Sequence, residues 1–223
     1  MIGIIDYGMG NLFSVSKALQ HMDIPHVVSA SPSELQTCKG LLLPGVGAFP
    51  DAMKSLEASG MKDFLLHQVN QGVPLLGICL GMQLLFEESA EGKGAAGLAL
   101  LPGRVVRFTG QDVLGNRYKV PHMGWNDLTF YQRNDVLTQS ITGGYVYFVH
   151  SYYVETMDPS IVIASARYET EVPAIVGKGN VYGTQFHPEK SATTGMAILG
   201  NFCNFIMKKE ECLYGTIHNL SSY

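Results

Sequence analysis

Residues 73–83 read Val-Pro-Leu-Leu-Gly-Ile-Cys-Leu-Gly-Met-Gln, and the fold class can be inferred from this stretch. The apolar run 73–78 predicts a buried strand, and residues 80–88 predict the helix that follows it. Cys79 stands between them with a glycine two residues away on each side, which is the G-x-S-x-G elbow with a thiol in place of the hydroxyl. Such a turn presents the nucleophile beside a helix N-terminus, where backbone N–H groups favour a thiolate. A small structural cysteine in a glycine-rich turn is the alternative explanation.

Segments with strand and helix character alternate on both sides of the elbow. The apolar run Gly40–Leu43 predicts a buried strand that is stopped by Pro44. Asn11 is the expected N-cap of a helix whose apolar stripe follows it, and further helices are expected from Pro50 and over residues 61–72. This alternation is typical of α/β proteins.

The second half of the chain is richer in β-type sequence. Between residues 104 and 184, four strand-like runs are separated by polar turns, and a helical stripe from Met196 to Ile206 closes the pattern. We therefore predict an α/β fold in a single domain, with a mixed, largely parallel sheet flanked by helices. Residues 1–209 are assigned to this domain, and residues 210–223 to a C-terminal tail of unknown role.

Composition argues against nucleic-acid and membrane roles. Charged residues make up 15% of the 223 residues and the net charge is −4, so no basic field is available to hold a polyanion. The first six residues lack a basic start and include Asp6, so no signal peptide is expected. Residues 64–86 carry no charge, but their polar residues and glycines indicate helix, turn and strand rather than a membrane span.

The cysteines and glycines point to no metal and no cofactor. Cysteines stand at positions 38, 79, 203 and 212 without C-x-x-C spacing, which predicts reduced thiols in the cytoplasm. No His/Cys cluster has zinc spacing, so no metal is expected. Gly8 and Gly10 follow the first strand, but the third glycine of a dinucleotide fingerprint is missing.

Residues 185–189 read Gln-Phe-His-Pro-Glu and supply partners for a thiol nucleophile. They follow the strand-like run 181–184, so His187 is expected near a strand end, where the sites of α/β proteins gather. On an extended backbone His187 and Glu189 point to the same side, and the proline between them stiffens the pair. A carboxylate that orients an imidazole serving a thiol is a general nucleophilic arrangement. For the tripeptide alone, a solvated turn is the simpler explanation.

Residues 44–47 read Pro-Gly-Val-Gly and follow the strand predicted at 40–43. Such a loop can direct backbone N–H groups at a developing oxyanion, together with the N–H of Leu80. An ordinary turn at the exit of a strand explains the same glycines equally well.

At this point the motifs resemble a known family. Residues 44–49, 77–83 and 186–189 resemble the class I, triad-type glutamine amidotransferases. Residues 6–12, 121–126 and 147–152 are similar, more narrowly, to the glutaminase subunits of imidazole glycerol phosphate synthases. The resemblance runs to about Lys209 with its motifs in order, and the Cys/His/Glu set is intact.

The resemblance implies a thioester mechanism for glutamine hydrolysis. Cys79 attacks the side-chain amide, His187 transfers protons and Glu189 orients His187. The oxyanion hole is implied to involve Val46, Gly47 and Leu80. The residues implied to hold glutamine are Gly45, Gln83, Glu91, Ser151 and Tyr152.

The resemblance also implies a partner. Ammonia passes to a cyclase subunit with a (β/α)8-barrel fold, which makes imidazole glycerol phosphate and an aminoimidazole carboxamide ribotide in histidine biosynthesis. Candidate interface residues are Asn11, Trp125, Tyr147 and Lys190. Trp125 is the single tryptophan and lies in an expected Gly-Trp-Asn turn, where a contact role is more natural than a core role.

Three other functions compete with this one. The chain could feed ammonia to pyridoxal phosphate synthase or anthranilate synthase, families for which the string at 121–125 is not expected. A stand-alone γ-glutamyl hydrolase or cysteine peptidase should turn over without a partner. A non-enzymatic binding relative would usually have lost a member of the triad.

Overall fold

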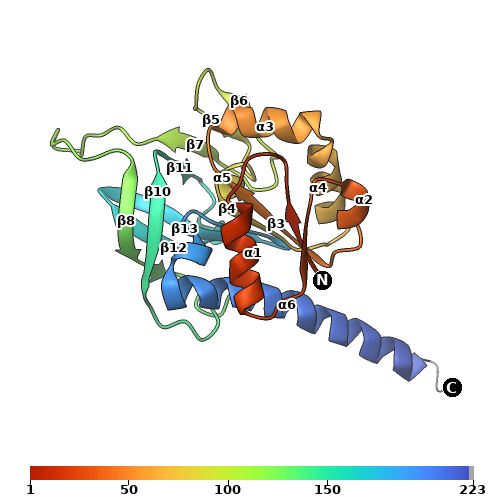
Figure 1. The fold of residues 1–223 in the computed structure, drawn as a ribbon. Coiled ribbons are helices and arrows are strands. Elements are labelled where there is room, and N and C mark those ends of the chain that lie inside the picture. Colours follow the sequence, from red (N-terminus) through yellow and green to blue (C-terminus); the bar gives the residue numbers. More distant parts are fainter. Residues whose placement is uncertain (221–223) are drawn as a thin grey trace.

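Eight strands form the central sheet of the computed structural model, which describes residues 1–220 and the side chains of residues 1–208 (Figure 1). Their order across the sheet is β2 (His26–Ser29), β1 (Ile2–Ile5), β3 (Gly40–Gly45), β4 (Leu75–Cys79), β14 (Val181–Thr184), β13 (Thr170–Lys178), β12 (Val162–Tyr168) and β9 (Thr129–Phe130). Strands β2 to β14 in this order pair in parallel, and the last three pair antiparallel. The mixed, largely parallel sheet expected from the sequence is confirmed.

Helices cover both faces of this sheet. Helices α1 (Leu12–His21) and α6 (Ala192–Leu220) pack on one face, and α3 (Phe49–Ala58) and α4 (Met61–Asn70) pack on the other. The alternation of strand side chains explains the two layers: Leu42 belongs to the first core cluster, whereas Leu41 and Leu43 belong to the second. The short helix α2 (Pro32–Leu35) follows β2. None of the helices within residues 1–220 is long and apolar enough to cross a membrane.

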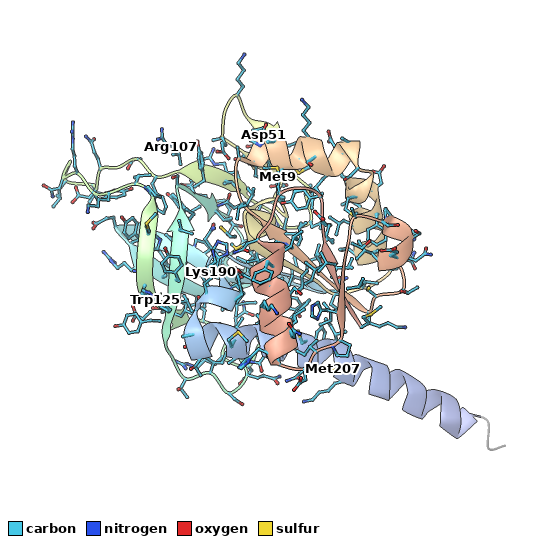
Figure 2. The ribbon with its side chains drawn as sticks, in the orientation of Figure 1. Met9, Asp51, Arg107, Trp125, Lys190 and Met207 are labelled. Carbon is cyan, nitrogen blue, oxygen red and sulfur yellow. The ribbon has the colours of Figure 1, made fainter. Side chains whose placement is uncertain are left out.

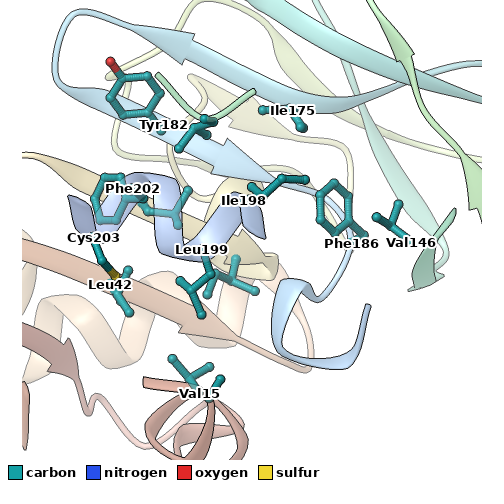
Figure 3. Packing of buried hydrophobic residues seen from close by; sticks show 14 of the residues in the cluster. Val15, Leu42, Val146, Ile175, Tyr182, Phe186, Ile198, Leu199, Phe202 and Cys203 are labelled. Atoms are coloured by element: carbon teal, nitrogen blue, oxygen red, sulfur yellow. The ribbon is translucent and has the colours of Figure 1, made fainter. Parts of the chain in front are cut away.

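The first core cluster fixes the segment that carries the predicted catalytic histidine. Phe186 is fully buried and lies between Ile198 of α6 and Val146 (Figure 3). Phe202 and Cys203 of α6 pack toward the sheet in the same layer. Burying a phenylalanine stabilises the fold by about 1.5–3 kcal/mol, so the neighbouring residue His187 is held by its backbone.

Two smaller sheets flank the central one. The two-stranded ribbon of β8 (His122–Asp127) and β10 (Tyr145–His150) is antiparallel, with Trp125 opposite Tyr147. The four-stranded sheet has the order β11 (Tyr152–Glu155), β7 (Arg104–Arg107), β5 (Glu88–Ser89) and β6 (Ala95–Ala96). Short 3-10 turns lie at η1 (Pro159–Ile161) and η2 (Pro188–Lys190).

The helix after the elbow is shorter than the sequence predicts. It was expected over 80–88, but α5 ends at Gln83 (Leu80–Gln83). The carbonyl groups that a longer helix would use accept instead from the segment that returns past it: Leu98 N donates to Leu84 O and Leu100 N to Leu85 O, both at 2.8 Å. Tertiary hydrogen bonds therefore replace the local helical ones.

Two further expectations were wrong in detail, and the expected C-terminal tail can be described in part. Pro44 does not stop β3, which continues to Gly45. Strand β1 pairs with β3 only as far as Leu42, so the edge of β3 that faces β1 makes no ladder hydrogen bonds at Pro44, and the missing N–H of the proline is tolerated there. Trp125 lies in strand β8 and not in a turn. The closing helix α6 continues past Lys209, so residues 210–220 of the expected tail are helical, and Figure 1 shows this end of α6 projecting from the body. Residues 221–223 of that tail lie outside the described residues.

Candidate active site

Cys79 stands at the junction of β4 and α5 in a conformation that few residues adopt. Its φ is +56° and its ψ is −111°, a strained backbone that side-chain-bearing residues rarely show. The turn is packed too closely for larger neighbours, because a Cβ on Gly81 would overlap the carbonyl oxygen of Leu43. The expected elbow with its glycines is therefore present, and it places Cys79 at the carboxyl end of a parallel strand.

His187 and Glu189 lie at the end of the next parallel strand. Strand β14 pairs with β4, with Thr184 opposite Ile78, so the residues that follow the two strands emerge at the same edge of the sheet. His187 Nδ1 lies 2.8 Å from Glu189 Oε1, and both side chains are almost fully buried. Glu189 Oε2 has no hydrogen-bond partner among the described residues, so the contact with His187 is the side-chain hydrogen bond that this carboxylate makes there.

The electrostatics of the site favour a positively charged imidazole. Burial lowers the pKa of His187, but hydrogen bonds with Cys79 and Glu189, together with their negative charges, outweigh it and raise the pKa to about 9. Cys79 and His187 also line the same cavity, so the imidazole is placed to serve the thiol. A thiolate paired with an imidazolium is the arrangement that activates a cysteine nucleophile.

Two glutamine side chains extend from the thiol. Gln185 Nε2 lies 3.9 Å from Cys79 Sγ, and its carbonyl oxygen accepts from Gln83 Nε2 at 3.0 Å. Gln83 Nε2 also donates to the carbonyl oxygen of Tyr152 at 2.8 Å. This network joins the elbow, β14 and β11, and it fixes the amide of Gln83 at the wall of the site.

Most of the predicted site residues line one cavity of about 400 Å³. The lining comprises Val46, Gly47, Cys79, Leu80, Gln83, Glu91, Pro121, Val149, His150, Ser151, Tyr152 and His187. Gly45 does not line it, but lies buried at the end of β3, opposite Cys79 in the ladder. Glu189 stands behind His187. Residues far apart in the sequence therefore meet around the thiol as expected.

Glu91 serves the fold as well as the cavity. It lies in the loop after β5, and its Oε2 accepts a 2.7 Å hydrogen bond from the backbone N–H of Phe49, at the start of α3. A carboxylate at a helix N-terminus is stabilised by the helix dipole.

The sequence analysis missed a pair of buried histidines. His150 lines the cavity and its Nδ1 lies 2.8 Å from the carbonyl oxygen of Tyr152, while its Nε2 lies 3.0 Å from His122 Nδ1. His122 stacks between the rings of Phe148 and Tyr168. Burial lowers the pKa of His150 to about 3, so it is neutral and acts as a support for the cavity wall. Both histidines lie in motifs at 121–126 and 147–152, but their contact depends on the β8–β10 register.

The four candidate interface residues are placed as follows. Asn11 caps α1 by accepting from Ser14 N at 3.3 Å. Trp125 is 51% exposed, and Figure 2 shows it at the edge of the molecule on β8. Its ring lies 5.9 Å from that of Tyr147. Lys190 is exposed at the end of η2. Trp125, Tyr147 and Lys190 belong to elements that contact one another, because β10 packs against η2.

The other two cysteines among the described side chains, and a wider hollow, lack this chemistry. Cys38 and Cys203 are buried free thiols, and burial raises the pKa of Cys203 to about 12. A hollow of about 1020 Å³ between β7, β11 and β13 has no cysteine or histidine in its lining. Among the described side chains, no three His, Cys, Asp or Glu residues gather as metal ligands would. The reactive groups are therefore those of the smaller cavity.

Comparison with known proteins places this site in a family. The sequence profile described as glutamine amidotransferase class-I matches residues 3–205. The imidazole glycerol phosphate synthase subunit HisH of Geobacillus sp. strain WCH70 is 60% identical, covering 94% of this chain and 99% of that protein. HisH of Bacillus subtilis strain 168 is 54% identical, covering 91% of this chain and 95% of its own.

Solved structures agree on the fold. A crystal structure of a glutamine amidotransferase superimposes with a TM-score of 0.71 at 21% identity, covering 92% of this chain and 98% of that one. A chain of PurLQS from Thermotoga maritima gives a TM-score of 0.68 at 16% identity, covering 92% of this chain and 98% of that one.

Proposed function

Because this chain belongs to the class-I glutamine amidotransferase family, and within it to the HisH subunits, we propose that it is the glutaminase of imidazole glycerol phosphate synthase. The observation that carries the proposed chemistry is the cavity in which Cys79 and His187 lie together with Gln83 and Glu91. Cys79 is a nucleophile and His187 an acid for the side-chain amide of glutamine, and Glu91 is a carboxylate for its α-ammonium group. The cavity thus has a partner for each of the two ends of glutamine.

The first half of the reaction forms a thioester. The Cys79 thiolate attacks the amide carbon, and the oxygen of the tetrahedral intermediate accepts from the N–H of Leu80 and from the loop of Val46 and Gly47. The imidazolium of His187 gives its proton to the departing ammonia. A pKa of about 9 keeps that proton on His187 at neutral pH. The products of this half are ammonia and a γ-glutamyl thioester on Cys79.

The second half releases glutamate. Water attacks the thioester, and the now neutral His187 accepts its proton. The Glu189 carboxylate, 2.8 Å from Nδ1, keeps Nε2 directed at the reacting atoms and stabilises the imidazolium that forms again. Breakdown of the intermediate returns the Cys79 thiolate and frees the cavity.

Glutamine is held by groups already in place around the thiol. Glu91 uses one oxygen for Phe49 N, which leaves the other for an α-ammonium group. Gln83, Ser151 and Tyr152 line the same cavity. In this proposal Gly45 acts behind the cavity, by letting β3 approach the elbow closely.

The ammonia is used by a partner. We propose that the chain forms a heterodimer with a cyclase of (β/α)8-barrel fold and that ammonia passes directly to it for histidine biosynthesis. The exposed aromatic face of the β8–β10 ribbon, together with Lys190 and Asn11, is the proposed contact surface. The buried free thiols suit a reducing compartment, and we propose the cytoplasm as the site of the reaction.

The test compares the isolated chain with the complex. We expect slow glutamine hydrolysis by the chain alone and a strong increase with a cyclase and its nucleotide, because the glycines at 45 and 47 permit two backbone states of the oxyanion loop. Mass spectrometry of quenched samples should find the γ-glutamyl adduct on Cys79. Equal turnover with and without a competent cyclase would favour a stand-alone hydrolase.

A further inference from the structure

The hydroxyl of Tyr7 is a buried polar group that the mechanism above does not use. Tyr7 follows β1, its side chain is 4% exposed, and its hydroxyl has no hydrogen-bond partner among the described residues. Most buried polar atoms in folded proteins are partnered, and an orphan calls for an explanation. The backbone here is fixed, because Ser55 of α3 donates to the Tyr7 carbonyl oxygen at 2.5 Å.

This hydroxyl lies directly behind the elbow. A Cβ built on Gly45 would lie 2.7 Å from the Tyr7 hydroxyl, 2.8 Å from the backbone nitrogen of Gly81 and 3.1 Å from Leu80 Cβ. Gly45 is the residue opposite Cys79 in the β3–β4 ladder. The hydroxyl is therefore placed where the end of β3 meets the turn that carries the nucleophile, and Tyr7 is not among the residues that line the cavity.

The charges around Tyr7 favour a neutral donor. Burial raises its pKa, and the negative charge of Cys79 raises it further, so the phenol keeps its proton in the neutral pH range. Because the phenol stays neutral, it adds no negative charge beside Cys79, and an O–H dipole directed at the sulfur stabilises a thiolate. The other titratable groups at the sulfur are His187, held by Glu189, and both belong to the cavity side.

We propose that Tyr7 is a positioning residue for the nucleophile, whose otherwise unpartnered O–H turns toward Cys79 and stabilises its thiolate from behind the elbow. This inference rests on the proposed function, because it assigns Cys79 as the nucleophile. The cavity side then supplies the imidazolium and the buried side supplies a neutral dipole. A dipole fixed in a water-excluded space needs no reorganisation when the charge forms.

The test is Tyr7→Phe, which removes only the hydroxyl, with Tyr182→Phe as the matched control. Tyr182 is also buried, but it packs against Phe202 in the first core cluster (Figure 3), and it lies opposite Leu76 in the β14–β4 ladder, three residues before Cys79. The rate at which iodoacetamide alkylates Cys79 is measured against pH, with the Cys79→Ala chain giving the background from the other cysteines. For Tyr7→Phe we expect the midpoint to rise by about one pH unit and the rate below it to fall about tenfold, because the dipole that stabilises the thiolate is lost.

Stability distinguishes this role from a structural one. Removing an unpartnered buried hydroxyl should leave the unfolding midpoint of Tyr7→Phe unchanged or higher, while Tyr182→Phe keeps the wild-type alkylation profile. An alkylation profile of Tyr7→Phe that overlays the wild type would overturn the proposal, as would a shift matched by Tyr182→Phe. If Tyr7→Phe fails to fold, the test is NMR of the wild-type chain. The ¹³Cζ resonance of Tyr7 must then change over the pH range in which the alkylation rate of Cys79 changes, and in Cys79→Ala it must stay constant over that range.

Failure of this inference is separable from failure of the proposed function. A wild-type complex that hydrolyses glutamine while Tyr7→Phe alkylates normally removes Tyr7 from the account and leaves the glutaminase assignment intact. A complex without glutaminase activity overturns the proposed function whatever the alkylation profile shows.

Discussion

Two walls of the same cavity are built in opposite ways. The elbow wall is buried, and its nucleophile sits in a strained turn between glycines that admit no Cβ. The wall formed by the β8–β10 ribbon is half open: His122, Phe148 and His150 face inward, while Met123, Trp125 and Tyr145 face outward and are exposed. The first wall has the features of a reacting group held in place, and the second has those of a surface that meets a partner.

The two walls are connected at the catalytic histidine. The backbone N–H of His187 donates to Tyr147 O at 3.2 Å, and Tyr147 N donates to Ser191 Oγ at 2.9 Å. Ser191 Oγ in turn donates to the carbonyl oxygen of His187 at 2.6 Å. These bonds join the ribbon to the segment that carries His187. The reacting thiol and the exposed aromatic side chains nevertheless lie on different walls, so the comparison predicts a different main effect for damage to each.

Replacing the nucleophile should have the largest effect. Cys79→Ala should lower glutamine hydrolysis by at least about 10⁴-fold, as loss of a triad nucleophile does. Binding of the cyclase and ammonia-dependent synthesis by the complex should remain, because the ribbon wall is untouched. Glutamine turnover is measured by glutamate release. Residual hydrolysis above a few per cent of wild type would remove Cys79 from the mechanism.

Glu189→Gln should have the next largest effect. We expect kcat to fall by about 10²–10⁴-fold, because the orienting charge behind the imidazole is lost while the shape is kept. The pKa of His187 should fall from about 9 toward its ordinary value, which NMR of the ring can measure. An unchanged His187 pKa would mean that Glu189 does not hold the charge.

The same variant has a pH signature in stability. The folded pKa of His187, about 9, lies above its ordinary value of 6.5, so its pairing contributes stability that is complete below pH 6.5 and is lost as the pH rises through 9. The free energy of unfolding of the wild type should exceed that of Glu189→Gln most clearly at about pH 6. This difference should narrow by about pH 9. A difference that is constant over this range would contradict the assignment.

Trp125→Ala tests the ribbon wall. We expect the dissociation constant for the cyclase to rise about thirtyfold, the loss of about 2 kcal/mol typical of an interface hot spot. The melting temperature should stay near that of the wild type, because the indole is 51% exposed. Met157→Ala, a side chain 99% exposed on another surface, is the control and should bind as the wild type. Unchanged affinity with a large drop in melting temperature would make Trp125 a core residue instead.

Asn11 should give the smallest effect. Asn11→Ala removes the N-cap of α1 and should lower the free energy of unfolding by about 1 kcal/mol. Asn11→Asp keeps the capping oxygen and should restore that stability. Chemical denaturation gives the stability of each variant, and binding to the cyclase is measured in parallel. Weaker binding of Asn11→Asp at wild-type stability would assign the amide itself to the interface.

The sequence was sufficient where the chemistry is local. Cys79 with its glycines, and His187 with Glu189, could be recognised because each motif lies within five residues. Apolar stripes predicted α1 and α4, and Pro50 predicted the start of α3. The sequence was insufficient where distant segments meet. The length of α5 depends on hydrogen bonds that the backbone N–H groups of residues 97–101 donate to the segment after the helix. The roles of Tyr7 and His150 depend on which strand lies beside the elbow. The motifs contained these residues, but no spacing rule connects them.

Isotope transfer tests the account most directly. Glutamine labelled with ¹⁵N in its amide is given to the complex of this chain and its cyclase, in the presence of a large excess of unlabelled ammonium. If Cys79 releases ammonia into a closed path to the partner, the imidazole glycerol phosphate formed should carry ¹⁵N with little dilution. Product whose isotope content equals that of the ammonium in solution would contradict direct transfer between the two subunits.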